Sequence, residues 1–571
     1  MILLNPAQES FEQFDPVTRE LLLKTVRWFE DRGKRWIKHD DHERVWYQEF
    51  LDFVAREKIF ATFLTPAGII DNDRRWDTNR IAAMNEVLGF YGLAYWYTWQ
   101  VTILGLGPIW MSANQPVKTK TACLLDRGGI FAFGLSEKEH GADIYASAMK
   151  LKPQPDGSYL AEGEKYYIGN ANQAALVSVF GRIADSDDYV FFIVDSQHEK
   201  FECVQNICNS QNYVAEFRLN DYPVSPDDIL STGRTAWDAS LNTVNVGKYN
   251  LGWASIGICT HAFYEALNHA AQRKLFGSFV TEFTHIKQNF TDAFVRLAAM
   301  KLFAARAADY LRSANSADRR YLLYNPMVKM KVTTQGEEVI NLLWDVIAAK
   351  GFEKDMYFEL AARDIRALPK LEGTVHVNMA LIIKFMANYF FRSQAYADIP
   401  LRNDPANDDF LFDQGTTSGL SKIRFHDYRI AYRSVDLPNV HIFRKQIAML
   451  KGFLLLARPD KNQITDFDFL LNLGELFSLV VYGQLIIEKF QLDHLDLELL
   501  DQIFDCMIRD FSKFALNLYS KTGSTVRQRW FCRRMIRQPA VDPARYQGIL
   551  DKFVYSLKDS YEMNAGDGPV E

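Results

Sequence analysis

The stretch RDIRALPKLEGT, residues 363–374, contains the acidic side chain that decides how this chain is interpreted. Glu372 follows an apolar residue and precedes a predicted helix, where most glutamates are exposed charges close to a helix N-terminus. If Glu372 faces a lipophilic pocket instead, burial raises its pKa by up to about 3–5 units. A carboxylate of that kind is a usable general base near neutral pH.

Helical periodicity surrounds this stretch. Apolar side chains recur at spacings of three and four residues, which predicts amphipathic helices. The predicted helices start at about Val244, cover Ile286 to Leu311 and Pro326 to Ala349, and start again after Gly373 to run past Phe391. Such a series is typical of an antiparallel bundle, to which we assign residues 241–396.

The chain before the bundle divides into a helical part and a β part. Residues 1–128 are predicted to be mostly helical, with Phe90–Met111 as a buried helix pair. From Phe131 to about Val224 the pattern becomes alternating, and Pro155-Asp156-Gly157 predicts a turn. The predicted strands include Tyr159–Ile168, Ala175–Ile183 and Tyr189–Val194. Residues 129–240 therefore form a β-domain of ordinary size.

The chain after the bundle is predicted to be helical again. Residues 397–421 are rich in Asp, Asn, Pro and Gly, which indicates a linker or surface loop. Residues 422–571 form an additional helical domain, with helices at Val440–Leu456, Phe467–Phe490 and Leu497–Tyr519 and a disordered end at residues 564–571. The predicted fold class is mainly α with a central β-barrel module. The absence of a G-x-G-x-x-G motif and of strand–helix alternation disfavours a Rossmann fold.

Composition limits the partners. A net charge of −6 gives no electrostatic reason to expect nucleic acid or an anionic membrane surface. The six cysteines form no C-x-x-C pair, so we expect reduced thiols and no metal site. The most apolar run, Leu473 to Ile487, is interrupted by Glu475 and is too short to span a bilayer. We therefore expect a cytoplasmic protein without a transmembrane segment or signal peptide.

Three other short segments contain candidate ligand contacts. They are FGLSEKEHGAD at residues 133–143, KYYIGNA at 165–171 and RKLFG at 273–277. Taken alone, the first is better explained as a polar surface turn. The second fits either an aromatic wall for a planar ring or ordinary cross-strand packing. In the third, Arg273 either binds phosphate or is a basic residue at a helix C-terminus, and local evidence favours the latter.

Together, in this order, the four segments resemble motifs of the acyl-CoA dehydrogenase superfamily, which also includes the acyl-CoA oxidases. The first resembles the family's T-E-P-x-x-G-S-D, the second K-x-W-I-T-N and the third R-x-x-F-G. Residues 351–374 resemble the family's G-(F/Y)…R-D…E-G-T, which is the most specific match. The resemblance covers about residues 20–395. It implies an N-terminal helical domain, a β-domain and a four-helix bundle, and the C-terminal block resembles the extra domain of oxidases and very-long-chain dehydrogenases.

The resemblance also implies roles for individual residues. Glu372 takes the position of the catalytic base, and the alternative position for a base in a related subgroup falls near Gly247, which cannot serve. The implied FAD contacts are Leu135, Ser136, Tyr167, Gly169, Thr374 and His376, together with Arg273, Phe276, Asp345, Ala348 and Ala349 toward the FAD of a neighbouring subunit. The implied substrate contacts are Ala142, Asn245 and Lys248.

Several positions depart from the family pattern. Tyr167 replaces a Trp, and Gly169 replaces a Thr or Ser whose hydroxyl usually bonds flavin N5. Ala348 and Ala349 replace a Gly-Gly pair, and Asp345 replaces a Gln, so a methyl and a carboxylate approach the expected pyrophosphate. Ala142 replaces a Ser near the tail of the substrate.

The function implied is α,β-dehydrogenation of an acyl thioester, on CoA or an acyl carrier protein, to a trans-2-enoyl thioester. The electron acceptor would be an electron-transfer flavoprotein. One alternative is an acyl-CoA oxidase that uses oxygen, and a second is a degenerate homologue that acts as a binding protein. A contact between Arg273 and the FAD of another subunit implies a homodimer or homotetramer.

Overall fold

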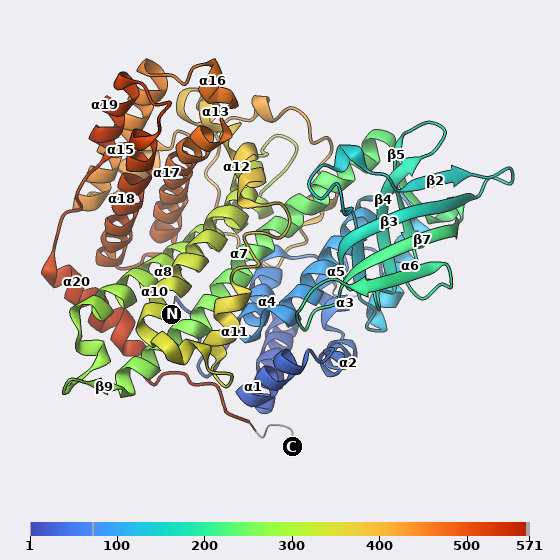
Figure 1. The fold of residues 1–571 in the computed structure, drawn as a ribbon, viewed down its shortest axis with the longest axis horizontal. Coiled ribbons are helices and arrows are strands. Elements are labelled where there is room, and N and C mark those ends of the chain that lie inside the picture. The colour runs from blue at the N-terminus through green and yellow to red at the C-terminus, as the bar shows by residue number, and fades with distance from the viewer. Residues whose placement is uncertain (1, 71–73, 567–571) are drawn as a thin grey trace.

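The computed structural model describes residues 2–70 and 74–566. Figure 1 shows the β-domain at one end of the molecule and the C-terminal helices at the other, with the N-terminal helices and the bundle between them. The order of the parts is the one that the sequence predicts, namely an N-terminal helical part, a β-domain and a helical bundle, followed by a further helical block.

Helices form the N-terminal part. They are α1 (Pro16–Glu43), α2 (Gln48–Arg56), α3 (Ile59–Leu64), α4 (Thr78–Tyr91), α5 (Leu93–Met111) and α6 (Gln115–Asp126). The Asp15 side chain caps α1 by accepting from Thr18 N, and Asp77 caps α4 in the same way. The predicted helix pair at Phe90–Met111 is wrong, because the break comes at Gly92 and a single helix, α5, follows it.

The β-domain is one eight-stranded sheet. Its strands are β1 (Phe131–Gly134), β2 (Lys150–Pro153), β3 (Tyr159–Gly169), β4 (Leu176–Ile183), β5 (Tyr189–Val194), β6 (Phe201–Asn206), β7 (Val214–Val224) and β8 (Ile229–Thr232). The order is β6-β7-β3-β2-β4-β5-β8, and β1 pairs in parallel with the first half of β4. The three strands predicted from alternation are confirmed to within one residue at each end.

The bundle consists of long helices packed on the N-terminal part. It contains α7 (Gly233–Gln272), α8 (Thr284–Arg312), α9 (Tyr321–Met327), α10 (Thr333–Ile347), α11 (Tyr357–Asp364), α12 (Val375–Ile383) and α13 (Met386–Phe391). Helix α7 packs against α4, α5, α8 and α10 and is buried on most sides, so its pattern is not that of a one-sided surface helix.

Two predicted helix boundaries in the bundle are wrong. Helix α7 begins at Gly233 rather than near Val244, because its first residues mix polar and buried apolar side chains and conceal the helical period. The last predicted helix does not run past Phe391. It divides into α12 and α13 at Lys384 and ends at Phe391.

Residues 397–421, predicted to be a linker or surface loop, lie mostly at the surface and contact both the N-terminal part and the bundle. The segment has only short helical turns, but it is tied into the protein by buried polar side chains. Asp408 accepts from Thr78 N and from the Arg312 guanidinium, and Gln414 accepts from the Tyr321 hydroxyl at 2.7 Å. Its polar residues therefore make internal hydrogen bonds to the N-terminal part and the bundle.

The C-terminal block packs on the bundle. Its helices are α14 (Arg429–Arg433), α15 (Pro438–Leu456), α16 (Lys461–Thr465), α17 (Phe467–Asp493), α18 (Leu497–Ser520), α19 (Val526–Met535) and α20 (Pro543–Ile549). The three helices predicted here are confirmed. Paired hydrogen bonds join Arg296 of α8 to Asp510 of α18, and Arg509 of α18 to Asp292 of α8.

Helix α17 is longer than the apolar run in the sequence suggests. Among the described residues it is the one helix long and apolar enough to cross a membrane, with a mean hydropathy of 1.6 over 18 residues. However, 78% of that window is buried inside the protein, and the core helix of a globular protein meets the same criterion. The prediction that the apolar run Leu473 to Ile487 is too short to span a bilayer is therefore wrong in respect of length.

The end of the chain packs beside the N-terminal part. Gly33, with φ 77°, kinks α1, and the amides of Lys34 and Arg35 donate to the carbonyls of Asn564 and Ala565. Part of the segment predicted to be disordered is therefore hydrogen-bonded, whereas residues 567–571 lie outside the described residues.

Candidate active site

The turn between α11 and α12 holds Glu372 in an unusual backbone conformation. Glu372 has φ 50° and the next residue, Gly373, has φ 85°. A left-handed conformation at a residue other than glycine costs about 1–3 kcal/mol and is most common at functional sites. Thr374 then caps α12, accepting from Val377 N.

The Glu372 carboxylate points into the protein, against α7. Its Oε2 is shielded from solvent and has no hydrogen-bond partner among the described residues. A β-carbon placed on Gly247 would lie 2.6 Å from this oxygen and 2.6 Å from Leu104 Cδ2. Gly247 therefore provides the space that the carboxylate occupies. Residues 247 and 372, the two positions considered for the catalytic base, therefore face each other, and only Glu372 has an acidic side chain.

Burial is the main cause of the altered acidity of Glu372. It raises the pKa of the carboxyl group from 4.5 to about 7, against the Gln100 hydrogen bond and the positive charges of Lys329 and Lys248. The same burial lowers the pKa of Lys329 to about 7 and that of Lys248 to about 8. A base with a pKa near the ambient pH is well suited to abstract a carbon-bound proton.

Lys329 stabilises the turn that contains Glu372. It lies in a π-helical segment, Val328–Val332, between α9 and α10. Its Nζ donates to Pro369 O and to Gly373 O, both at 2.6 Å, so it bridges the chain on either side of Glu372. Insertions of this type in a helix are frequent at functional sites.

A chain of buried amides leads away from the carboxylate. Gln100 Nε2 donates to Glu372 Oε1 and to Gly247 O, and its Oε1 accepts from Asn250. Asn250 in turn accepts from Asn85, at 3.0 Å. The sequence interpretation missed Gln100, Asn250, Asn85 and Lys329. No local pattern marks Asn85, Asn250 or Lys329, which have other polar side chains nearby, and Gln100 is marked only as the one amide in the largely apolar helix α5.

The first two predicted segments lie together. The Ser136 hydroxyl donates to Tyr166 O at 2.8 Å, and Tyr166 N donates to Ser136 O at 3.0 Å. Buried Lys165 pairs with Glu137 at 2.7 Å and also donates to Leu135 O. The Ser136 hydroxyl therefore contacts backbone, while its neighbour across the strand end, Tyr167, is 62% exposed with φ 65°.

The third segment and the end of α10 lie far from Glu372. Arg273 and Phe276 lie at the end of α7, about 40 Å along the helix axis from Gly247 at 1.5 Å per residue. Phe276 is 99% exposed with φ 51°, at the tip of the hairpin formed by β9 (Lys274–Leu275) and β10 (Ser278–Phe279). The Arg273 guanidinium makes no ion pair with any residue that the structure describes.

The predicted contacts at the end of α10, namely Asp345, Ala348 and Ala349, are all exposed, and Ala348 has φ 58°. Ala348 thus keeps the left-handed backbone that a glycine adopts without strain.

The remaining predicted cofactor and substrate contacts differ in burial. Thr374, His376 and Ala142 are exposed, and Lys248 is half-buried beside Glu372. Asn245 is buried and donates to Gln414 of the 397–421 segment at 3.4 Å. Asn245 is therefore held by structural contacts in this conformation.

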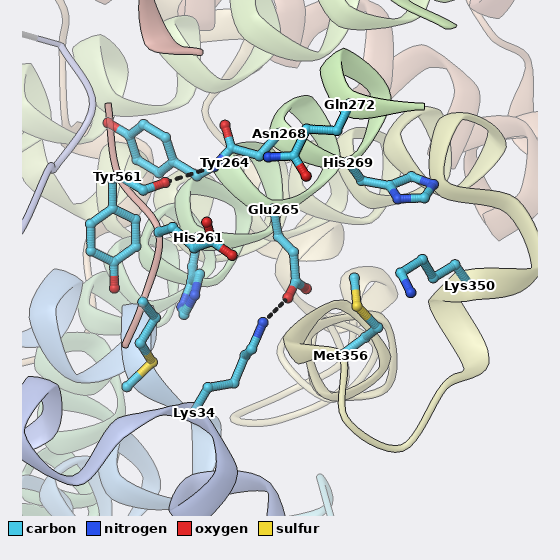
Figure 2. Close-up of a pocket in the computed structure, with 12 residues that line it drawn as sticks. Lys34, His261, Tyr264, Glu265, Asn268, His269, Gln272, Lys350, Met356 and Tyr561 are labelled. Carbon is cyan, nitrogen blue, oxygen red and sulfur yellow. Dashed lines mark hydrogen bonds and ion pairs between the residues drawn. The ribbon is translucent and has the colours of Figure 1, made fainter. Parts of the chain in front are cut away.

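A cavity of about 130 Å³ lies elsewhere, at the C-terminal end of α7 (Figure 2). Lys34 pairs with Glu265 across it at 2.9 Å, and Asn268 donates to Tyr561 O. Its lining includes Gln272 and Lys350, the neighbours of Arg273 and Ala349, so these two predicted contacts lie at the same end of the bundle. No residue that lines this cavity contacts Glu372.

Comparison with known proteins finds similarity to acyl-CoA dehydrogenases in both sequence and fold. Residues 236–387 match the acyl-CoA dehydrogenase C-terminal domain. The chain is 25% identical over 311 residues to a 3-(aryl)acrylate reductase of Clostridium sporogenes, covering 53% of this chain and 81% of that protein. It is 22% identical over 350 residues to a short-chain-specific acyl-CoA dehydrogenase of Megasphaera elsdenii, covering 59% and 90%.

The fold similarity extends over nearly the whole chain. An acyl-CoA dehydrogenase from Bacillus anthracis, solved with FAD, superposes with a TM-score of 0.74 at 15% identity and covers 97% of both chains. The C-terminal block therefore has a counterpart in a solved structure. Residues 236–387 therefore match the acyl-CoA dehydrogenase C-terminal domain, and nearly the whole chain has the fold of a solved acyl-CoA dehydrogenase.

Proposed function

We propose that this protein is an FAD-dependent oxidoreductase that desaturates an acyl thioester between its α and β carbons, with Glu372 as the base. The observation that carries the proposal is the Glu372 carboxylate, which is buried opposite Gly247 with its pKa raised to about 7. A buried carboxyl group with this pKa, in a strained turn, is suited to act as a general base. A buried glutamate with a purely structural role would form an ion pair.

The residues present fit an FAD. Tyr167, Phe276 and Ala348 each keep a left-handed backbone, and the two aromatic rings are largely exposed. Exposed aromatics in strained conformations are stabilised when a ligand or a second chain covers them. Ala348 and Ala349 are exposed, so their methyl groups leave the approach to the backbone open, and the unpaired Arg273 can offset the charge of Asp345.

In this proposal Tyr167, Leu135 and Ser136 would hold the isoalloxazine, together with Gly169, Thr374 and His376. FAD, when bound, supplies the acceptor for the β-hydrogen and its electron pair. The Glu372 carboxylate removes the α-proton, which moves to one of its oxygens, and a trans-2-enoyl thioester remains. The Glu372 N–H makes no hydrogen bond to any described residue and can donate to the thioester carbonyl, which stabilises the developing enolate.

The substrate contacts follow from the same arrangement. Lys248 stands beside Glu372 at the edge of the site, and the exposed Ala142 lies in the first segment, toward the tail of the thioester. Asn245 would have to exchange its bond to Gln414 to reach a substrate. The carrier is proposed to be CoA, with an acyl carrier protein as the alternative.

The distance between the two groups of FAD contacts supports a homo-oligomer. Arg273, Phe276, Asp345, Ala348 and Ala349 lie at the end of the bundle remote from Glu372, so in one chain they cannot hold the FAD that faces this base. They are proposed to contact the FAD of a second subunit, in a homodimer or homotetramer. We further propose a cytoplasmic enzyme whose electrons pass to an electron-transfer flavoprotein.

The test is reconstitution with FAD followed by addition of acyl-CoA thioesters under anaerobic conditions. Formation of a 2-enoyl thioester by the wild type, and its loss in Glu372→Gln with FAD still bound, is expected. Peroxide formation in air would favour an oxidase. A protein that binds no flavin after reconstitution would favour the non-catalytic homologue.

A further inference from the structure

Tyr97 of α5 occupies the space beside Gly169. A β-carbon placed on Gly169 would lie 2.6 Å from Tyr97 Cε1, 2.8 Å from Tyr97 Oη and 2.9 Å from Val101 Cγ2. Gly169 does not have a positive φ, so backbone conformation does not require glycine here. The requirement is steric, because the phenol of Tyr97 takes the volume that any side chain at 169 would need.

One face of α5 connects this point to the catalytic base. Residues 97, 100, 101 and 104 are spaced by three and four and so share a face of the helix. Gln100 donates to Glu372, Leu104 approaches Gly247, and Val101 approaches Gly169. Tyr97 is thus on the helix face that spans the gap between Gly169 of β3 and the Glu372 carboxylate.

The Tyr97 hydroxyl is available to bind a ligand. The side chain is half-buried, and its Oη makes no hydrogen bond to any described residue. Burial raises the pKa of the phenol well above its usual value, with smaller contributions from Cys208, Tyr47 and Glu372. The hydroxyl therefore keeps its proton and, since its oxygen is not shielded from solvent, it can donate either to water or to a ligand.

We propose that Tyr97 is a positioning residue whose hydroxyl replaces the one that residue 169 lacks, donating a hydrogen bond to the flavin edge beside Glu372. The inference rests on the proposed function. Gly169 and Tyr97 are then a coupled pair: glycine at 169 is needed to admit the phenol, and the phenol supplies the hydroxyl.

The test uses four variants of the full-length holoprotein: Tyr97→Phe, Tyr97→Ala, Gly169→Ser and the double variant Tyr97→Ala/Gly169→Ser. The measurements are the FAD dissociation constant after reconstitution and the reduction potential of the bound flavin. Tyr97→Phe keeps the ring and removes only the hydroxyl, so FAD binding should weaken roughly three- to tenfold, as one neutral hydrogen bond supports. The potential should shift with it, which a purely structural role would not cause.

The double variant tests the coupling. Gly169→Ser alone should weaken FAD binding more than Tyr97→Phe does, because the new β-carbon displaces the phenol. Tyr97→Ala/Gly169→Ser should bind FAD better than either of its single variants, since the serine then has only the contact with Val101 Cγ2 at 2.9 Å to relieve.

Two results would overturn the inference: a Tyr97→Phe protein with the affinity and potential of the wild type, or a double variant no better than Tyr97→Ala. Failure of the proposed function has a different signature, namely a wild type that retains no FAD at all.

Discussion

Replacing Glu372 by Gln should stabilise the folded protein at alkaline pH while it removes the base. Burial raises the pKa of Glu372 from 4.5 to about 7, so the folded state holds this proton more tightly than the unfolded state does. Ionising the group therefore costs folding free energy, and the cost grows as pH rises from about 4.5 to about 7 and is constant above. A neutral Gln of the same shape does not incur it.

The size of the effect follows from the two pKa values. A difference of about 2.5 units at 1.36 kcal/mol per unit gives about 3 kcal/mol at about pH 8, and about 1 kcal/mol or less at about pH 5. Asp364, whose pKa burial also raises to about 7, is present in both proteins, so its contribution cancels in the comparison.

The assay is urea unfolding of the flavin-free wild type and Glu372→Gln at the two pH values. Glu199→Gln is the matched control, since Glu199 is exposed and makes no ion pair among the described residues. The variant should be more stable than the wild type at about pH 8, and the gain should shrink at about pH 5. A variant equal to or less stable than the wild type at about pH 8 would refute a buried, high-pKa carboxylate.

Three further variants test the surroundings of the base and the C-terminal block. Gly247→Ala places a methyl 2.6 Å from the Glu372 oxygen, so turnover should fall about tenfold or more with the circular dichroism spectrum unchanged; normal turnover would contradict the geometry. Lys329→Met removes both donors to the turn and should lower the free energy of unfolding by about 3 kcal/mol and reduce kcat, and an unchanged kcat would remove its positioning role. Asp510→Ala leaves Arg296 unpaired and should cost about 3 kcal/mol in urea unfolding, which a loss below about 1 kcal/mol would disprove.

Sequence patterns predicted much of the fold from two kinds of signal. Strand β3 and helix α18 have one more buried face, whereas β5 and α17 are buried on most sides and stand out as apolar runs. The start of α7 was missed because the helix is buried on several sides, so no single stripe marks its first turns. The polar composition of residues 397–421 predicts their place at the surface, but it gives no sign of buried partners such as Arg312.

The candidate site was located from sequence only at the base itself. Glu372 follows from the motif around it, but its surroundings consist of Gln100 from α5, Lys329 from a π-helical turn and Gly247 from α7. These residues lie on three separate elements, and their mutual distances are set by helix packing. A local sequence pattern contains no information on such distances, so Tyr97 and the buried amides could not be predicted.

Anaerobic titration of the FAD-loaded protein with a series of acyl-CoA thioesters measures the central assignment most directly. The visible absorption band of the flavin should bleach when the wild type meets a thioester it accepts, and Glu372→Gln should keep the band unbleached with the same thioester bound. Equal bleaching of the two proteins would contradict Glu372 as the base.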